Sequence, residues 1–257
     1  MATALGRLFA RPVLDLLRGQ AQCLGRAVDL VWMLAGLAGG WWLYVPLHEL
    51  LHAAGCVLAG GRVYRLEIAA HYGGGLLAAV FPWVHAGGDY AGRLAGFDTG
   101  GSDWTYLATD LAPYVLVLFP GVWALRLAAR RGAAFAFGLL LPFAFAPFLS
   151  LTGDAYEIGS LAAAQMPAWE GGAARALLVG DDLALRAAEL GTAGASSSLW
   201  TGFAFAALVG VLWAFATYGL GSLAAAALGQ RPLLPPVARG EDAEPDDETG
   251  ARLRARR

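Results

Sequence analysis

Four long apolar stretches constrain the fold of this chain more than any other feature of the sequence. Hydrophobic residues make up 58% of the chain and charged residues only 15%, whereas an average soluble domain carries about 25% charged residues. A membrane-spanning helix needs about 20 mostly apolar residues. The stretches that approach this length are residues 30–59, 104–127, 133–151 and 199–228. The sequence therefore predicts an all-α polytopic membrane protein with about four transmembrane helices and the lipid bilayer as its surroundings.

The segment after the first stretch has a different pattern. Gly60 and Gly61 are expected to end the first helix, and residues 63–68 alternate with a period of two, which predicts a short β element. Residues 76–84 are apolar but too few to span as a helix, so they are either a second strand or a segment that re-enters the membrane. Residues 87–103 are rich in Gly and Asp and predict a loop. A mixed segment, residues 152–198, is expected to be partly helical at the interface.

The two ends of the chain are polar. Residues 1–27 place four arginines among apolar residues at helical spacing, which predicts an amphipathic N-terminal segment on the membrane surface or a solvated leader helix. Residues 230–257 are Pro-rich, then acidic, then basic. Such a segment cannot bury enough apolar surface to fold alone, so we expect a disordered tail.

Charge predicts both location and orientation. The net charge of −2 favours no nucleic-acid partner, and all 18 basic residues are Arg, which is typical of a GC-rich bacterial genome. The expected location is therefore the inner membrane of a bacterium. Arginines cluster before the first apolar stretch, between the second and third, and in the tail, so the positive-inside rule places both termini in the cytoplasm.

The sequence His48-Glu49-Leu50-Leu51-His52 lies within the first apolar stretch. Residues four apart share one face of a helix, so the two imidazoles lie about 6 Å apart along the axis and can bind one Zn²⁺. Glu49 then lies beside the metal and is the expected catalytic base. Ionisable residues within a span are costly and usually functional, which favours a zinc-dependent hydrolase.

A third metal ligand must come from elsewhere, because catalytic zinc sites use three protein ligands and leave a position for water. The chain has four histidines, so the candidates are His71, His85 or a carboxylate. Asp154 is the first choice. Spans one and three run in the same direction, which brings Asp154 to the depth of the motif. Glu157, three residues later on the same helical face, is the alternative.

Two further residues, Asp110 and Pro113, lie in the first half of the second stretch. Proline in a helix interior frees backbone groups, which in a protease could help to hold an extended substrate. The alternative for Asp110 is a hydrated position at the membrane interface.

Together, the motif within a span, the β-like segment, the hairpin of two more spans and Gly153-Asp154 resemble the site-2 protease family of intramembrane zinc metalloproteases. The resemblance covers residues 30–159. It implies that His48 and His52 bind zinc, that Asp154 is the third ligand and that Glu49 is the general base. The family usually has Leu-Asp-Gly around the third ligand, where this chain has Thr152-Gly153-Asp154-Ala155. The family also usually places zinc nearer the cytoplasm, whereas the arginine distribution places this motif nearer the opposite face.

The predicted function is hydrolysis of peptide bonds in membrane-protein substrates by residues 28–229, a membrane metalloprotease-like domain. The predicted β element, residues 63–68, is a candidate for pairing with an unwound substrate. Two alternatives stay open: a membrane zinc protease of another family that uses Glu157 as a ligand, or a non-catalytic scaffold or substrate-binding relative.

Overall fold

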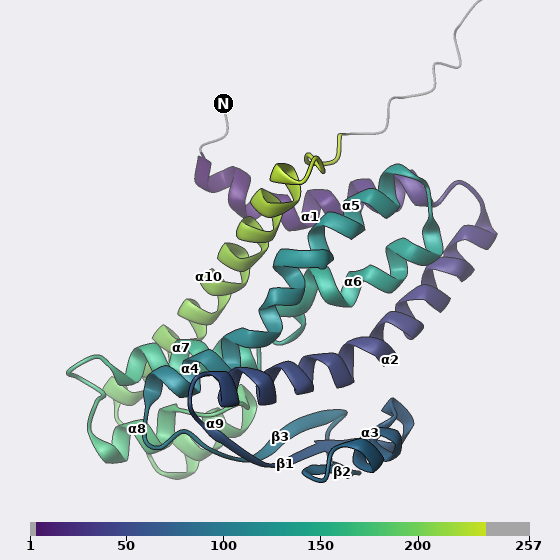
Figure 1. The fold of residues 1–257 in the computed structure, drawn as a ribbon. Helices are drawn as coiled ribbons and strands as arrows, with labels where there is room; N and C mark the ends of the chain where they lie inside the picture. The colour runs from purple at the N-terminus through teal and green to yellow at the C-terminus, as the bar shows by residue number, and fades with distance from the viewer. Residues whose placement is uncertain (1–3, 235–257) are drawn as a thin grey trace, which may run out of the picture.

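The computed structural model describes residues 4–234, so the predicted disorder of residues 235–257 lies outside the described residues. Within them, four helical segments are long and apolar enough to cross a membrane. These are Ala27–Leu58, Asp103–Arg130, Ala134–Ala164 and Ser197–Ala227. The prediction of an all-α polytopic membrane protein is confirmed, and the four segments form a bundle (Figure 1).

The first and fourth spans are single helices, α2 (Ala27–Leu58) and α10 (Ser197–Ala227). The predicted N-terminal helix is present as α1 (Ala4–Cys23). It crosses one end of the bundle, close to the place where the described chain ends, whereas the small β-sheet lies at the other end (Figure 1).

The second and third spans are interrupted. The second consists of α4 (Asp103–Leu111), the short turns η2 (Ala112–Tyr114) and η3 (Val117–Gly121), and α5 (Val122–Arg130). The third consists of α6 (Ala134–Leu149) and α7 (Asp154–Ala164).

The predicted end of the third span at residue 151 was therefore wrong. In the sequence, polar residues and Gly153 resemble a helix end. In the structure, the span continues as α7 from Asp154. This helix packs closely on α10, where Gly159 lies against the backbone of Ala206. Asp154 thus lies inside the third span, at its interruption, rather than at its end.

The packing of α2 against α6 sets the position of the motif. Gly36 and Gly40 of α2 lie directly against backbone atoms of α6, and Gly138 of α6 lies against the backbone of α2 at Met33. Small residues allow helix backbones in membranes to approach this closely. The C-terminal half of α2, which carries His48 and His52, is thereby held beside the α6–α7 junction.

Three strands form the sheet: β1 (Arg62–Ile68), β2 (Val84–Ala86) and β3 (Gly92–Asp98), in the order β2-β1-β3. The strand β1 pairs parallel with β2 and antiparallel with β3. Leu66, Ile68 and Val84 form an apolar cluster, and Leu50 of the motif packs against it. The sheet is therefore seated on the helix that carries the motif.

The structure confirms the strand predicted at residues 63–68 and corrects the two segments that follow it. Residues 76–84 form most of a short helix, α3 (Gly74–Val80), and the start of β2, because Leu77 and Ala78 pack against the apolar cluster of the sheet. The predicted loop, residues 87–103, contains β3. Its glycines give little strand propensity, so pairing with β1 determines its conformation.

Within residues 152–198, α8 (Gly172–Leu178) and α9 (Leu183–Thr192) follow α7.

The close approach of α2 to α6 predicts opposite effects at two adjacent glycines. A Cβ at Gly40 would lie 2.8 Å from Leu139 Cα, whereas a Cβ at Gly39 would meet nothing within 4 Å. We expect Gly40→Ala to lower the free energy of unfolding by about 1–3 kcal/mol through overpacking. Gly39→Ala should leave it unchanged or raise it by up to about 1 kcal/mol, because alanine is the better helix former. Thermal unfolding in one detergent measures both, and equal melting temperatures would contradict the packing.

Candidate metal centre

Three potential ligand atoms converge between α2 and the start of α7. His48 Nε2 lies 3.0 Å from Asp154 Oδ2, His52 Nε2 lies 3.6 Å from the same oxygen, and the two Nε2 atoms are 3.1 Å apart. In a tetrahedral zinc site with bonds of about 2.0–2.1 Å, neighbouring ligand atoms are about 3.3 Å apart. The triangle therefore has the size that one metal ion requires, and these residues form a group that could hold one.

The hydrogen bonds behind the histidines direct their lone pairs into the triangle. His52 Nδ1 lies 2.9 Å from the carbonyl oxygen of Thr109. Because a carbonyl only accepts, Nδ1 carries a proton, and the neutral ring presents a lone pair at Nε2. His48 Nδ1 lies 2.8 Å from the Tyr44 hydroxyl, which can accept in the same way. Partners of this kind are typical behind metal-binding histidines, since they fix both ring orientation and tautomer.

Asp154 completes this arrangement with an oxygen that lacks a hydrogen bond. Its Oδ2 is buried and forms no well-aligned hydrogen bond, despite the short distance to His48. A carboxylate oxygen and two imidazole lone pairs that face one another repel unless a proton or a metal ion lies between them, and a metal ion can bind all three at once. The donor set fits a divalent metal ion on this ground.

The carbonyl that orients His52 is available because of a proline. In an uninterrupted helix, the carbonyl of Thr109 would accept a hydrogen bond from the backbone N–H of residue 113. Residue 113 is proline and has no N–H. The carbonyl is therefore free at the junction of α4 and η2, as the sequence predicted for backbone groups near Pro113, and it accepts from His52 instead.

Glu49 lies next to the triangle and is almost fully enclosed, with 9% of its surface exposed. Its carboxylate makes no hydrogen bond to a described residue, so it is free to exchange a proton. Gly92, at the start of β3, passes directly over it: a Cβ there would lie 3.0 Å from Glu49 Cδ. A glycine is required at this close approach of the strand.

Cavities lie on two sides of the centre. The larger, of about 270 Å³, is bordered by Glu49, His52 and Asp154, by β3 and by the second half of α4. The smaller, of about 150 Å³, is bordered by Tyr44, His48, Glu49 and Asp154. Both reach Glu49 and Asp154, so water and a substrate group can approach the centre from different sides.

Carboxylates dominate the larger cavity. Asp110 is 2% exposed, and its Oδ2 has no hydrogen-bond partner. Glu157 is also buried and accepts a hydrogen bond from the Tyr106 hydroxyl. The only basic side chain on the described cavity wall is Arg93, which forms an ion pair with Asp181. The wall of this cavity is polar rather than lipid-like, and Asp110 belongs to it.

The predicted site residues thus separate into two groups. The structure brings His48, His52 and Asp154 together, with Glu49 beside them, whereas Glu157 is held by Tyr106 outside the triangle. His71 and His85 are exposed and lie outside this donor group among the described residues. Sequence reasoning missed Tyr44 and β3. Tyr44 carried a signal, because it precedes His48 by one helical turn on the same face.

Comparison with models of known protein families, with curated proteins and with solved structures finds no match to this chain. The chemistry of the centre is therefore inferred from its own residues.

The geometry predicts different effects for the two carboxylates on the first turn of α7. Asp154→Asn should lower metal affinity by at least tenfold, because it removes the charged ligand atom from the triangle. Glu157→Gln should leave affinity within a fewfold of the wild type, since Tyr106 holds this side chain away from the metal. Metal content after competition with a chelator measures both, and the reverse order would make Glu157 the ligand.

The role of Pro113 gives a second prediction. Pro113→Ala restores a backbone N–H that competes with His52 for the carbonyl of Thr109, so metal affinity should fall by about 10-fold, and at most about 100-fold. Pro142→Ala is the matched control, because Pro142 also lies within a helix but borders neither cavity. The same chelator competition applies, and equal affinities in the two variants would contradict this role.

Proposed function

We propose that this protein is an intramembrane zinc metalloprotease that hydrolyses peptide bonds of membrane-protein substrates. The observation that carries the proposal is the triangle of His48, His52 and Asp154 inside the spans, with the unbonded carboxylate of Glu49 at its side. Two histidines and one carboxylate are a ligand set of catalytic zinc sites that keep a position for water. This is also the set implied by the resemblance to site-2 proteases.

A Zn²⁺ ion held by His48, His52 and Asp154 would supply a Lewis acid for the scissile carbonyl and for the attacking water. Glu49 removes a proton from the attacking water and transfers it to the leaving amine. The carbonyl of Thr109 and the hydroxyl of Tyr44 keep both imidazoles turned toward the metal.

A transmembrane substrate must unwind before cleavage, because the carbonyls of a helix are internally hydrogen-bonded. The sequence makes residues 63–68 a candidate for pairing with the substrate. In the structure these residues belong to β1, the central strand of the sheet. Its edges already pair with β3 on one side and, over part of its length, with β2 on the other. The better candidate is β3, which has a neighbouring strand on one side only among the described residues and contributes five residues to the larger cavity. A substrate strand paired with β3 would pass close to Glu49.

The proposed location is the inner membrane of a bacterium, with both termini in the cytoplasm. One end of the bundle carries α1, the α5–α6 turn and the last described residues. Arginines gather at this end, and the positive-inside rule therefore supports a cytoplasmic position for it. The centre then lies toward the opposite face of the membrane (Figure 1).

Glu49→Gln tests the catalytic role directly. We expect cleavage of a co-expressed library of membrane substrates to fall by at least about 100-fold, because the general base is lost. Zinc content should be retained, because the three ligands remain. Glu170→Gln is the matched control, since Glu170 is exposed and borders neither cavity.

Identical product patterns from the wild type and Glu49→Gln would contradict proteolysis at this centre. With zinc retained in both, that result would favour the non-catalytic scaffold or substrate-binding relative.

A further inference from the structure

A second polar site lies at the end of the bundle opposite the metal centre (Figure 1). It is a cavity of about 610 Å³ between α1, the end of α5 and the last described residues. The residues that line it include four arginines and no acidic residue: Arg11, Arg18, Gln22, Arg130, Arg231, Pro232, Leu233 and Leu234. An arginine guanidinium stays protonated in proteins, so the cavity wall carries four positive charges.

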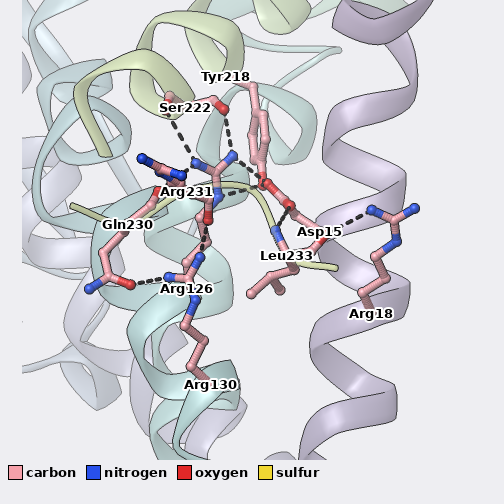
Figure 2. Close-up of polar contacts among 9 residues, drawn as sticks. All are labelled: Asp15, Arg18, Arg126, Arg130, Tyr218, Ser222, Gln230, Arg231 and Leu233. Carbon is pink, nitrogen blue, oxygen red and sulfur yellow. Dashed lines mark hydrogen bonds and ion pairs between the residues drawn. The ribbon is translucent and has the colours of Figure 1, made fainter. Parts of the chain in front are cut away.

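A buried ion pair builds the wall of this cavity. Arg126 and Asp15 are 0% and 1% exposed, and Asp15 Oδ2 accepts from Arg126 Nη2 at 2.6 Å and from Nε at 3.0 Å (Figure 2). The Tyr218 hydroxyl donates to the same oxygen at 3.1 Å, and the backbone N–H of Leu233 lies 3.4 Å from Asp15 Oδ1. Because a buried charge needs a paired and hydrogen-bonded environment, this network holds α1 and the C-terminal segment in place.

Within residues 4–234, the acidic group that contacts the segment lining the cavity is Asp15, and it belongs to this network. Asp15 neutralises Arg126, which also donates to the backbone carbonyls of Ser222 and Gln230. The network therefore compensates the charge of Arg126, and no described acidic residue compensates the charges of the four lining arginines.

In the described part of the chain, those four arginine side chains have only neutral hydrogen-bond partners or none. Arg18 donates to the carbonyl of Leu233 at 2.6 Å, and Arg130 donates to the Gln230 side chain and the Arg231 carbonyl (Figure 2). The guanidinium groups of Arg11 and Arg231 make no hydrogen bond to any described residue. Like charges gathered around one cavity repel one another, and an anion within it would offset that repulsion.

The exposed surface of α1 indicates which anion. Arg11, Asp15, Arg18 and Gln22 share one face of the helix by their spacing, toward the cavity. On another face, Val13 and Leu17 lie one turn apart and are 54% and 56% exposed. A helix with a cationic face and an exposed apolar face is typical of the membrane interface. Beside this helix, a phospholipid would place its phosphate in the cavity and its acyl chains against the apolar face.

We propose that the arginine cavity binds the phosphate headgroup of an anionic phospholipid. Guanidinium groups suit phosphate because they can donate two parallel hydrogen bonds to its oxygens. The arginine-rich end of the bundle is the predicted cytoplasmic end, where anionic lipids attract basic segments. The inference is independent of the metal centre and of proteolysis.

Native mass spectrometry of the full chain in detergent tests the proposal with phosphatidylglycerol and phosphatidylcholine of equal chain length. We expect the wild type to retain phosphatidylglycerol in clear excess. Arg11→Gln/Arg231→Gln should weaken its retention by about tenfold or more, because two phosphate-binding groups are lost. The control Arg26→Gln/Arg131→Gln removes the same charge near the same end, outside the cavity, and should change retention less than twofold.

Three results would overturn the proposal: equal retention of the two lipids, equal losses in the two double variants, or full displacement of the lipid by millimolar inorganic phosphate. The last result would identify a site for free phosphate rather than for a lipid. Because both double variants keep the Asp15–Arg126 pair, an unchanged melting temperature and metal content would show that the fold is intact.

Discussion

The mutual repulsion of three lone-pair atoms is the constraint on which the functional half of this structure depends. His48 Nε2, His52 Nε2 and Asp154 Oδ2 lie within 3.6 Å of one another inside the membrane-spanning bundle. The outward nitrogens of both rings are already committed to Tyr44 and Thr109. A divalent cation converts the repulsion into coordination. The proposed binding of a metal would therefore be coupled to the tight packing of α2 on α6, which brings these atoms together.

Interruptions of the spans create the groups that the centre uses. A bilayer span normally satisfies all its backbone groups internally, and continuous helices would leave neither a carbonyl for His52 nor a turn for Asp154. Pro113 frees the carbonyl of Thr109, and the break after α6 starts a new helix with Asp154 in its first turn. Both interruptions lie next to the motif, since the carbonyl of Thr109 accepts from His52 and the carboxylate of Asp154 contacts His48. The irregular backbone of these two spans thus lies next to the group of potential metal ligands.

Those features of the centre that depend on local periodicity could be predicted from the sequence. The spacing of His48 and His52 follows from a single helix, and the direction of the spans placed Asp154 at the same depth. Pro113 indicated a freed carbonyl but not its partner, since that partner lies 57 residues away. The strand β3 and the approach of Gly92 to Glu49 were invisible, because strand pairing and not propensity determines them. The prediction ended the third span too early for a related reason. Gly153 is typical of a helix end in a sequence, whereas in the packed bundle it lies at a break between two helices of one span.

Zinc K-edge X-ray absorption of the purified protein tests the central claim most directly, since it reports the ligands of the bound ion without reference to a substrate. The account predicts one zinc per chain with only nitrogen and oxygen neighbours at about 2.0–2.2 Å, including the scattering pattern of two imidazoles. Cys56 lies one turn beyond His52 but is buried with its sulfur directed to the carbonyl of Arg62. A sulfur neighbour at about 2.3 Å, or a failure of the zinc-supplemented protein to retain the metal, would contradict the account.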